Sequence, residues 1–453
     1  MDLFGTAGIR GNAETDVTPS LALKAGRAAG VDGSTVVVGR DGRTTGPALT
    51  AALEAGIESA GADVVRIGEV PTPTLAYASR GRRGIMVTAS HNPPTDNGLK
   101  FFVDGVEYDQ SAEATIAERI AADPDPVGWE RWGGGRNDDP LPTYRDAVIE
   151  YTREHVGRCS DVRVAVDCGN GMASLATPQV LNRLGADVVA LNANVDGHFP
   201  GRASKPTTES ISDLRAFVAD GAFDLGIAHD GDADRIVVVD ADGDVVHEDT
   251  VLAIVAGFYT AESDADDPVT VTTPNASGRI DAHVETKGGR VERIRLGALH
   301  EGIAAAEHGG SDAAVVFAAE PWKHVHPEFG GWIDGVVSAA VFTALVARDG
   351  LDSLREPISE RPYRKMSVDC PEQSKTAVMD QLERTLPDSF PDASVTTEHG
   401  VRLSFDDGAW TLVRPSGTEP YVRVYAESDA VDGLTETVVA AIEAAVDDAR
   451  ATE

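Results

Sequence analysis

Cysteine and lysine are scarce in this 453-residue chain. The three cysteines, Cys159, Cys168 and Cys370, are odd in number and not clustered, which argues against a disulfide framework or a zinc site and fits a reducing compartment. Seven lysines stand against 32 arginines, and the net charge is −35. With no basic run, the acidic surface excludes nucleic acid and anionic membranes as partners. The acid excess with little lysine suggests adaptation to high salt.

Long apolar runs are also missing. The longest, around residues 251–259, is far shorter than the ~20 residues that a membrane span needs. The first residues, Met-Asp-Leu-Phe-Gly, lack the basic start and apolar core of a signal peptide. An apolar content of 42% indicates a folded protein, and the length favours about three or four domains. We therefore expect a cytoplasmic, multidomain protein with no membrane contact.

A weak internal repeat organises the first three quarters of the chain. Each copy has a β-branched strand with a glycine-rich or polar turn, a helix, a second strand, a helix and a third strand. The first strands open the segments 35–42, 162–171 and 269–278, the second strands are 62–67, 186–191 and 291–296, and the third are 84–89, 224–228 and 313–318. This order predicts βαβ units whose mostly parallel strands end on one edge of each sheet.

The remaining residues have a different pattern. A helix is expected over 374–385, strands over 401–405, 410–413 and 421–426, and an alanine-rich helix from about 434. Proline-, glycine- or acid-rich stretches at 123–142, 261–268 and 355–371 are expected to be linkers. The sequence thus predicts three similar, mixed and mostly parallel α/β domains followed by a smaller α+β domain, with boundaries 1–142, 143–255, 256–355 and 356–453.

The third strands end in loops that carry chemistry. After strand 84–88 comes Ala89-Ser-His-Asn-Pro-Pro94, whose two prolines hold Ser90 on a rigid turn. A polar turn is the plainer interpretation of Ser-His-Asn alone. After strand 224–228 comes Asp230-Gly-Asp-Ala-Asp-Arg235, with carboxylates at i, i+2 and i+4 that suit Mg²⁺. The same spacing recurs at Asp240-Ala-Asp-Gly-Asp244, which reads as a hairpin turn, so spacing alone leaves the metal site open.

Two further loops have the composition of anion sites. Arg414-Pro-Ser-Gly-Thr-Glu-Pro420 offers a guanidinium, hydroxyls and a glycine for close approach to phosphate, although a hairpin turn would also use it. Arg10 lies in a glycine-rich segment, a weak signal by itself. Lys100 follows the serine loop in a chain with few lysines, and a solvated lysine is the alternative. A nucleophile, a metal set and phosphate loops together indicate phosphoryl transfer.

These motifs, in this order over residues 5–427, resemble the α-D-phosphohexomutase family of phosphoglucomutases, phosphomannomutases and phosphoglucosamine mutases. The resemblance implies four domains around a central cleft. It implies that a small phosphosugar substrate, a Mg²⁺ ion and a sugar bisphosphate intermediate serve a 1,6-phosphoryl transfer on a hexose. It leaves monomer or homodimer open.

The resemblance also implies roles for single residues. Ser90 would carry the phosphoryl group, and Ser90, Asp230, Asp232 and Asp234 would hold the metal. Arg235 would lie beside it, Arg10 would assist near Ser90, and Lys100 or His324 would handle the proton of the sugar hydroxyl. Glu320, Trp322, Lys323 and His324 would contact the sugar. The non-transferred phosphate would be held by Arg414, Ser416, Gly417, Thr418 and Arg423.

The sugar loop departs from the family pattern Glu-x-Ser-Gly-His, because it reads Glu320-Pro-Trp-Lys-His324. We expect Trp322 to reshape the site, which favours a pentose phosphate (1,5-transfer) or an amino sugar as alternative substrates. A Mg²⁺-dependent phosphatase that uses Ser90 is a second class of function, and a sugar-phosphate-binding regulator without activity is a third.

Overall fold

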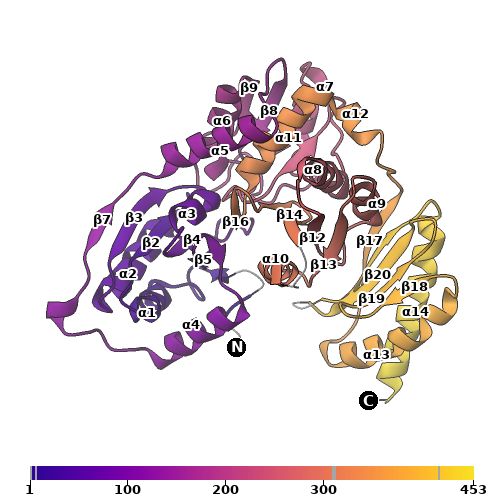
Figure 1. Cartoon of the computed structure of the whole chain (residues 1–453). Helices are drawn as coiled ribbons and strands as arrows, with labels where there is room; N and C mark the ends of the chain where they lie inside the picture. Colours follow the sequence, from indigo (N-terminus) through magenta and orange to yellow (C-terminus); the bar gives the residue numbers. More distant parts are fainter. Residues whose placement is uncertain (1–2, 6–7, 309–312, 417–418, 453) are drawn as a thin grey trace. The chain divides into compact units, whose positions relative to one another are not determined.

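The computed structural model describes residues 3–5, 8–308, 313–416 and 419–452, whose elements are drawn in Figure 1. The chain divides into two compact units. Unit 1 consists of Met1–Val251 and Val315–Arg355, and unit 2 consists of Leu252–Ala314 and Glu356–Glu453.

The first sheet of unit 1 has seven strands in the order β1-β5-β4-β2-β3-β7, with β6 beside β5. Strands β2, β3, β4 and β7 pair in parallel, whereas β1, β4 and β6 pair antiparallel to β5. The strands are β1 (Ile9–Asn12), β2 (Val36–Arg40), β3 (Val64–Glu69), β4 (Arg83–Val87), β5 (Asp96–Val103), β6 (Val106–Glu107) and β7 (Gly135–Asn137).

Four helices accompany this sheet: α1 (Pro19–Gly30), α2 (Gly46–Ser59), α3 (Thr72–Ala78) and α4 (Gln110–Ala122). Helix α1 starts where the Thr18 hydroxyl accepts the Leu21 N–H at 3.3 Å and Pro19 takes the first position. Helices α1 and α2 approach closely because Gly26 has no side chain. A Cβ at this position would lie 2.1 Å from the Leu53 carbonyl oxygen. This packing buries one face of the sheet and fixes the strand ends that carry the serine loop.

The second sheet of unit 1 has the order β11-β10-β8-β9. Strand β8 pairs in parallel with β9 and β10, and β11 is antiparallel to β10. The elements are β8 (Arg163–Asp167), β9 (Asp187–Leu191), β10 (Leu225–Ala228), β11 (Val237–Val239), α5 (Leu141–His155), α6 (Thr177–Leu184) and α7 (Ser212–Asp220). The segment Asp240–Asp244 is a turn, closed by the Asp240 N–H to the Asp244 carbonyl at 2.9 Å, so the hairpin expected there is confirmed.

Strands β14 (Ala313–Glu320), β15 (Lys323–His326) and β16 (Gly330–Ile333) form an antiparallel run, followed by α11 (Gly335–Asp349) and α12 (Leu351–Arg355). Asp334 caps α11, because its carboxylate accepts the N–H groups of Val336 and Val337 at 3.0 and 2.9 Å. The helix is buried along nearly its whole length, so its first turn is a rigid support for β15.

Unit 2 begins in α8 (Glu248–Glu262), which crosses the division, and contains the parallel pair β12 (Asp267–Thr272) and β13 (Arg290–Arg293) with α9 (Gly278–Thr286) and α10 (Leu299–His308). Its second sheet is antiparallel, in the order β17-β21-β20-β19-β18. The elements are β17 (Tyr363–Asp369), α13 (Lys375–Thr385), β18 (Ser394–Thr396), β19 (Val401–Ser404), β20 (Trp410–Pro415), β21 (Tyr421–Glu427) and α14 (Val431–Thr452). Four 3-10 turns complete the described elements: Trp129–Arg131, Met172–Leu175, Glu372–Ser374 and Pro387–Ser389.

The predicted fold class is confirmed: the first two sheets of unit 1 are mostly parallel, with antiparallel strands toward one edge, and the C-terminal sheet is antiparallel. The four domain boundaries stay predictions. The linker expected at 355–371 is wrong in its second half, since β17 occupies Tyr363–Asp369 and pairs with β21. The linker expected at 123–142 contains the short edge strand β7.

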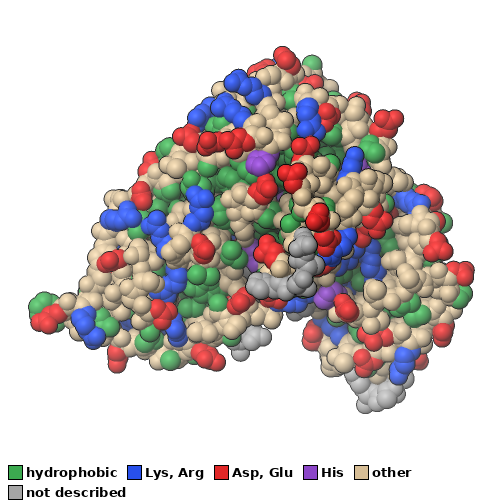
Figure 2. Space-filling view, in the orientation of Figure 1, with side chains coloured by type: hydrophobic (Ala, Val, Ile, Leu, Met, Phe, Trp, Pro, Cys, Tyr) green, Lys and Arg blue, Asp and Glu red, His purple; other side chains and the backbone are tan. Residues whose placement is uncertain are grey.

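The surface agrees with the composition. On the face drawn in Figure 2, acidic side chains are spread over the surface of both units rather than gathered in one patch. Cys159, Cys168 and Cys370 are buried free thiols. Within the described part of the chain, the longest apolar helices fall short of what a membrane crossing requires.

Candidate active site

Ser90 lies three residues beyond the end of β4 and is fully buried. Its φ is +51°, a left-handed conformation that is unusual for a residue with a side chain and is common at functional turns. The Thr88 hydroxyl accepts the Ser90 N–H at 2.9 Å and donates to Asp41 at 2.7 Å. Local hydrogen bonds therefore hold the serine in this conformation, as the prolines of the loop led us to expect.

Arg43 fixes the rest of the serine loop, and the sequence reasoning missed it. The buried guanidinium donates to the backbone carbonyls of Ser90 and Asn92, each at 2.8 Å, and to those of Pro93 and Asp96. Its Nε donates to Asp41 at 3.0 Å. The sequence did contain a signal for this role. Arg43 follows the end of β2, and β2 pairs in parallel with β4, so Arg43 and the serine loop lie at the same edge of the sheet.

The three aspartates follow β10 on a loop and lie close together. Their ligand oxygens, one from each of Asp230, Asp232 and Asp234, are within 4.8 Å of one another, and all three side chains are buried. The Ser90 hydroxyl donates to Asp230 Oδ2 at 2.8 Å. The structure thus brings the serine and the carboxylate cluster together, although 140 residues separate them in the sequence.

The donor set fits a divalent cation. Asp232 Oδ1 and Asp234 Oδ1 are buried without a hydrogen-bond partner. Burying carboxylate oxygens without partners is costly, and a hard cation such as Mg²⁺ satisfies such oxygens. Asp230 Oδ2, in contact with the serine hydroxyl, is the third oxygen available. The cluster could therefore hold a metal ion directly beside Ser90.

The pKa shifts of the aspartates also reflect the cost of burying several carboxylates together. Burial, with the neighbouring carboxylates of Asp234 and Asp232, raises the pKa of Asp230 well above its usual range. Burial also acts to raise the pKa of Asp234, but the cations of Lys100 and Arg235 outweigh it, and the net shift is downward. The site therefore already contains an uneven charge distribution that a further cation would relieve.

Lys100, on β5, reaches this cluster. Its Nζ is 2.7 Å from Asp234 Oδ2 and 3.5 Å from Asp232 Oδ2, and its side chain is buried. Burial lowers the pKa of the ammonium, but the surrounding carboxylates reverse this and raise it above its usual range. Lys100 is therefore part of the cluster rather than a solvated lysine, and its role in proton transfer stays a prediction.

Two arginines were also predicted here. Arg235 Nε lies 3.7 Å from both Asp230 Oδ2 and Asp234 Oδ1. Burial, followed by the cations of Arg235 and of Arg10 on β1, lowers the pKa of His91, whose Nδ1 is 3.4 Å from the serine hydroxyl. Both guanidiniums thus act on the surroundings of Ser90.

Two side chains that the sequence did not indicate, Thr72 and Arg202, support the loop of residues 229–235 that carries the three aspartates, called the metal loop below. Thr72 donates its hydroxyl to Asp232 Oδ2 at 2.7 Å and its backbone N–H to the Asp232 carbonyl at 2.9 Å. Arg202 pairs with Asp167 at 2.6 Å and donates to the His229 carbonyl at 2.6 Å. Because these partners are far apart in sequence, only the folded chain shows them as a support for the carboxylates.

The loop predicted to bind sugar is a tight turn between β14 and β15, in which Glu320 pairs with Lys323. Trp322 has a φ of +70°, and its indole packs against the hydrophobic cluster around Ala228 and Val237. Lys323 forms a backbone bridge with Arg235 and lies 3.5 Å from Glu320 Oε2. The turn therefore adjoins the metal loop, whereas the proposed effect of Trp322 on the sugar stays a prediction.

His324 is buried at the start of β15. Its Nδ1 is 3.1 Å from the Ser338 hydroxyl, and its ring packs edge-on against Phe317, with centroids 5.5 Å apart. Burial lowers the pKa of His324 to about 3, so the imidazole is neutral at physiological pH.

In unit 2, the loop predicted to bind phosphate joins β20 and β21. Arg414 and Arg423 are directly opposite each other across these strands. Like charges in such a pair repel, and an anion between them would relieve the repulsion. Arg414 Nε is buried without a hydrogen-bond partner. Ser416 is buried in the same loop, whereas the predicted residues Gly417 and Thr418 lie outside the described residues.

Lys375 supports the phosphate loop and was also missed. Its buried Nζ donates to the carbonyls of Ser416 and Glu419 at 2.6 and 2.7 Å and pairs with Glu372. A lysine three residues after an acid at a helix start gave no sign of this contact. The ammonium group therefore links the two ends of the loop, at Ser416 and at Glu419.

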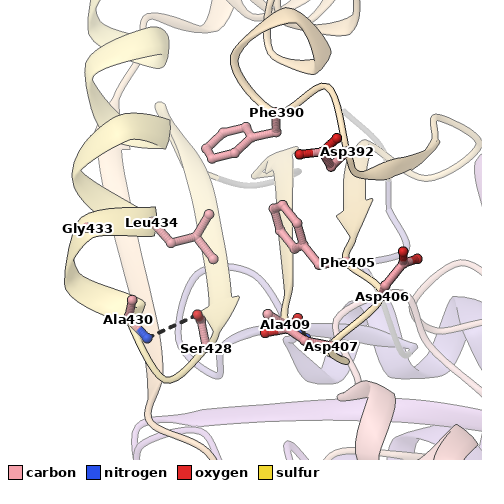
Figure 3. Close-up of a pocket in the computed structure, with 10 residues that line it drawn as sticks. All are labelled: Phe390, Asp392, Phe405, Asp406, Asp407, Ala409, Ser428, Ala430, Gly433 and Leu434. Atoms are coloured by element: carbon pink, nitrogen blue, oxygen red, sulfur yellow. Dashed lines mark hydrogen bonds between the residues drawn. The ribbon is translucent and has the colours of Figure 1, made fainter.

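A separate cavity of about 470 Å³ lies in unit 2 between the turn after β19 and the start of α14 (Figure 3). It is lined mainly by apolar side chains, with Phe390 and Phe405 at one side and Leu434 at the other, and by three aspartates. The turn from Phe405 to Ala409 precedes β20, so the cavity is at the opposite end of that strand from Arg414. None of the predicted site residues lines it.

Comparison with known proteins identifies the class. Residues 1–126, 142–243 and 366–445 match domain I, domain II and the C-terminal domain of Phosphoglucomutase/phosphomannomutase. The chain belongs to this family, the α-D-phosphohexomutases, and is an isomerase that moves phosphoryl groups. The resemblance inferred from the sequence motifs is thereby confirmed.

Named relatives differ in substrate. The chain is 42% identical over 438 residues to "Phosphopentomutase" of Thermococcus kodakarensis, covering 94% of each chain. It is 40% identical over 445 residues to "Probable phosphoglucosamine mutase" of Methanopyrus kandleri, covering 96% of this chain and 95% of the relative. A crystal structure of a phosphoglucomutase/phosphomannomutase family protein from Burkholderia thailandensis superposes with a TM-score of 0.84 at 26% identity, covering 98% and 97%.

Proposed function

We propose that the protein is a Mg²⁺-dependent phosphosugar mutase in which Ser90 carries the phosphoryl group. The observation that supports this most directly is the Ser90 hydroxyl, 2.8 Å from Asp230 Oδ2 in a cluster with two unpartnered carboxylate oxygens. Phosphoryl transfer depends mainly on positioning and on neutralising charge at the transferred group. A rigid, buried hydroxyl beside a set of metal ligands provides both.

In the proposed cycle, the phosphate of phospho-Ser90 passes to a hydroxyl of the bound sugar phosphate. The Ser90 Oγ–P bond breaks, the sugar O–P bond forms, and the hydroxyl proton leaves to a basic group. Lys100 and His324 are the residues predicted to handle this proton. The neutral imidazole of His324 can accept it, whereas the raised pKa of Lys100 keeps that side chain an ammonium. The resulting bisphosphate returns its other phosphate to Ser90. Asp230, Asp232 and Asp234 would hold Mg²⁺, which when bound neutralises charge on the transferred group. Arg414, Ser416 and Arg423 would hold the other phosphate, with Gly417 and Thr418 as further predicted contacts.

The identity of the sugar phosphate is a separate part of this proposal. The sequence alone puts a 1,6-transfer on a hexose first. The names of the two relatives favour a pentose phosphate and glucosamine phosphate, and the unusual Trp322 turn agrees with a changed sugar site. A panel of ribose, glucosamine, glucose and mannose 1-phosphates measures the preference. An ordinary hexose as best substrate, unchanged by Trp322→Ser, would contradict a role for Trp322.

The test of the proposed mechanism is Ser90→Ala. It removes the phosphoryl carrier, so mutase activity should fall by at least ~1,000-fold, and mass spectrometry should find no phosphate on this loop after priming with sugar bisphosphate. Ser59→Ala, which removes another buried hydroxyl on α2, is the matched control and should retain activity. Retained activity in Ser90→Ala would sink the proposal.

Analysis of the reaction products separates the mutase from the phosphatase alternative. In a phosphatase, water would take the phosphoryl group from Ser90, and inorganic phosphate would be the main product. The paired arginines of the loop in unit 2 favour the mutase, because a second phosphate clamp serves a bisphosphate and hydrolysis has no use for one. Isomerised sugar phosphate without net release of phosphate is the expected result.

A further inference from the structure

The Ser338 hydroxyl is at the centre of three close contacts in unit 1. It lies 2.7 Å from the Asp334 carbonyl oxygen, 3.1 Å from His324 Nδ1 and 2.9 Å from His326 Nε2. All four residues are buried. A hydroxyl has one proton and two lone pairs, so these three contacts use its whole hydrogen-bonding capacity.

The direction of each bond follows from the chemistry of the partners. The Asp334 carbonyl oxygen has no proton, so the short O···O contact of 2.7 Å is a hydrogen bond only if the hydroxyl donates. Once that proton is used, both histidine rings have to donate to the Ser338 oxygen. His324 must therefore carry its N–H at Nδ1, and His326 must carry its N–H at Nε2.

Both rings are neutral, so each has one N–H and one lone pair. Burial lowers the pKa of His324, and burial together with His324 lowers that of His326. A neutral imidazole with its proton on Nδ1 has an acceptor at Nε2. Its Nε2 can accept a hydrogen bond from a hydroxyl or an ammonium group, and it cannot donate one to a phosphate oxygen.

The support of this hydroxyl is rigid. Asp334 donates its backbone N–H to the His324 carbonyl at 2.8 Å, so the same residue holds both the strand and the serine. The Asp334 carboxylate caps α11 and accepts from Tyr144 at 2.8 Å and from Trp332 at 2.9 Å. The Ser338 hydroxyl therefore has a fixed position relative to both histidine rings, on the first turn of a buried helix.

We propose that Ser338 is a positioning residue that fixes His324 as the Nδ1–H tautomer, so that Nε2 accepts a hydrogen bond from a donor group of the sugar. The use of His324 toward the sugar rests on the proposed function, whereas the tautomer does not. The inference deepens the substrate class: the group read by His324 is a hydroxyl or an ammonium.

The test is the nitrogen spectrum of the full-length protein labelled with ¹⁵N-histidine, with the signals assigned from His324→Gln and His326→Gln. The wild-type protein should show protonated Nδ1 for His324 and protonated Nε2 for His326. In Ser338→Ala, His324 should shift toward the Nε2–H form, which free imidazole side chains prefer, and kcat/KM should fall about tenfold, as when a partner that orients a histidine is removed elsewhere. Ser338→Thr keeps the hydroxyl and should restore both readouts.

Thr343→Val is the matched control, because Thr343 is buried on the same helix and its hydroxyl has no hydrogen-bond partner. It should leave both the His324 tautomer and kcat/KM unchanged. Protonated Nε2 on His324 in the wild-type protein, or an unchanged tautomer in Ser338→Ala, overturns the inference. A protein with the expected tautomers and no mutase activity on any sugar would instead contradict the proposed function.

Discussion

Arg43 uses all five of its guanidinium N–H groups inside unit 1. Four go to backbone carbonyls of the segment from Ser90 to Asp96, and the fifth goes to Asp41. Five donors in a planar fork are a property of arginine that lysine lacks. A single side chain therefore sets the path of the loop on both sides of the serine.

Arg43→Lys should reduce kcat about 10- to 100-fold with Ser90 intact. Lysine has three donors, so at least one of the buried carbonyls loses its partner, at about 1–3 kcal/mol each, and the loop loosens. Steady-state kinetics with a primed enzyme measures the change. Arg66→Lys, which alters a partly exposed arginine paired with Glu54 and Glu58, is the control. An unchanged kcat in Arg43→Lys would show that the serine loop keeps its conformation without the five guanidinium hydrogen bonds.

The sequence predicted the serine and the aspartates that the structure brings together, and it missed the side chains that hold their loops. Ser90 and the aspartates follow strand ends in a recognisable order. Arg43, Thr72 and Lys375 make their contacts across 41 to 160 residues of sequence, through geometry that no local pattern encodes. Only the position of Arg43 at the end of β2 gave a usable signal.

At the scale of elements, the phosphate loop depends on the helix that packs beside it. Lys375→Met keeps the length of the side chain and removes the charge that binds the carbonyls of Ser416 and Glu419. The loop should then bind phosphate less tightly, so KM should rise several-fold while kcat changes less. Kinetics against substrate concentration tests this. Lys365→Met, on the exposed strand β17, is the control, and an equal rise of KM in both variants would contradict a specific role for Lys375.

Strand β17 shows why one element was not predicted. Five of its seven residues are exposed, and it lies at the edge of its sheet, so it lacks the alternation of apolar and polar residues that marks a half-buried strand. The prolines on both sides made a linker the better interpretation. The C-terminal helices α13 and α14 and the strands named from the sequence were predicted to within a few residues, whereas the buried strand β5, between β1 and β4, was not predicted.

At the scale of the whole molecule, buried neutral histidines make stability depend on pH. His326 has its pKa well below the usual value, whereas in the unfolded chain it titrates near ~6.5. Below that pH the unfolded state binds a proton that the folded state does not, so the histidine costs about 1.4 kcal/mol of stability per pH unit. The loss grows as the pH falls and is absent above ~7.

The comparison of wild type with His326→Gln isolates this contribution from those of the other ionisable groups. The difference in unfolding free energy between the two proteins, measured by urea titration, should shift against the wild type as the pH falls from 6.5 to 5 and be constant above 7. His198→Gln, at a side chain that is 76% exposed, is the control. A difference independent of pH would contradict a buried neutral His326.

Net charge should also control stability. With −35 on the chain, the folded state repels itself, and salt screens this repulsion. The melting temperature should rise between 0.1 and 2 M KCl, and it should do so similarly in NaCl if screening is the cause. A melting temperature that does not change with either salt would remove the support for adaptation to high salt.

The burial of Ser90 has a consequence for how the enzyme first becomes active. A protein kinase needs an accessible peptide segment, and Ser90 offers none, because it has no exposed surface and its backbone carbonyl is bound by Arg43. Under the proposed mechanism, the first phosphate would then come from a small molecule that enters the site, and the proposed sugar bisphosphate is such a donor. Each newly made chain would then depend on metabolite supply for its start, and its active fraction would follow the pool of bisphosphate in the cell.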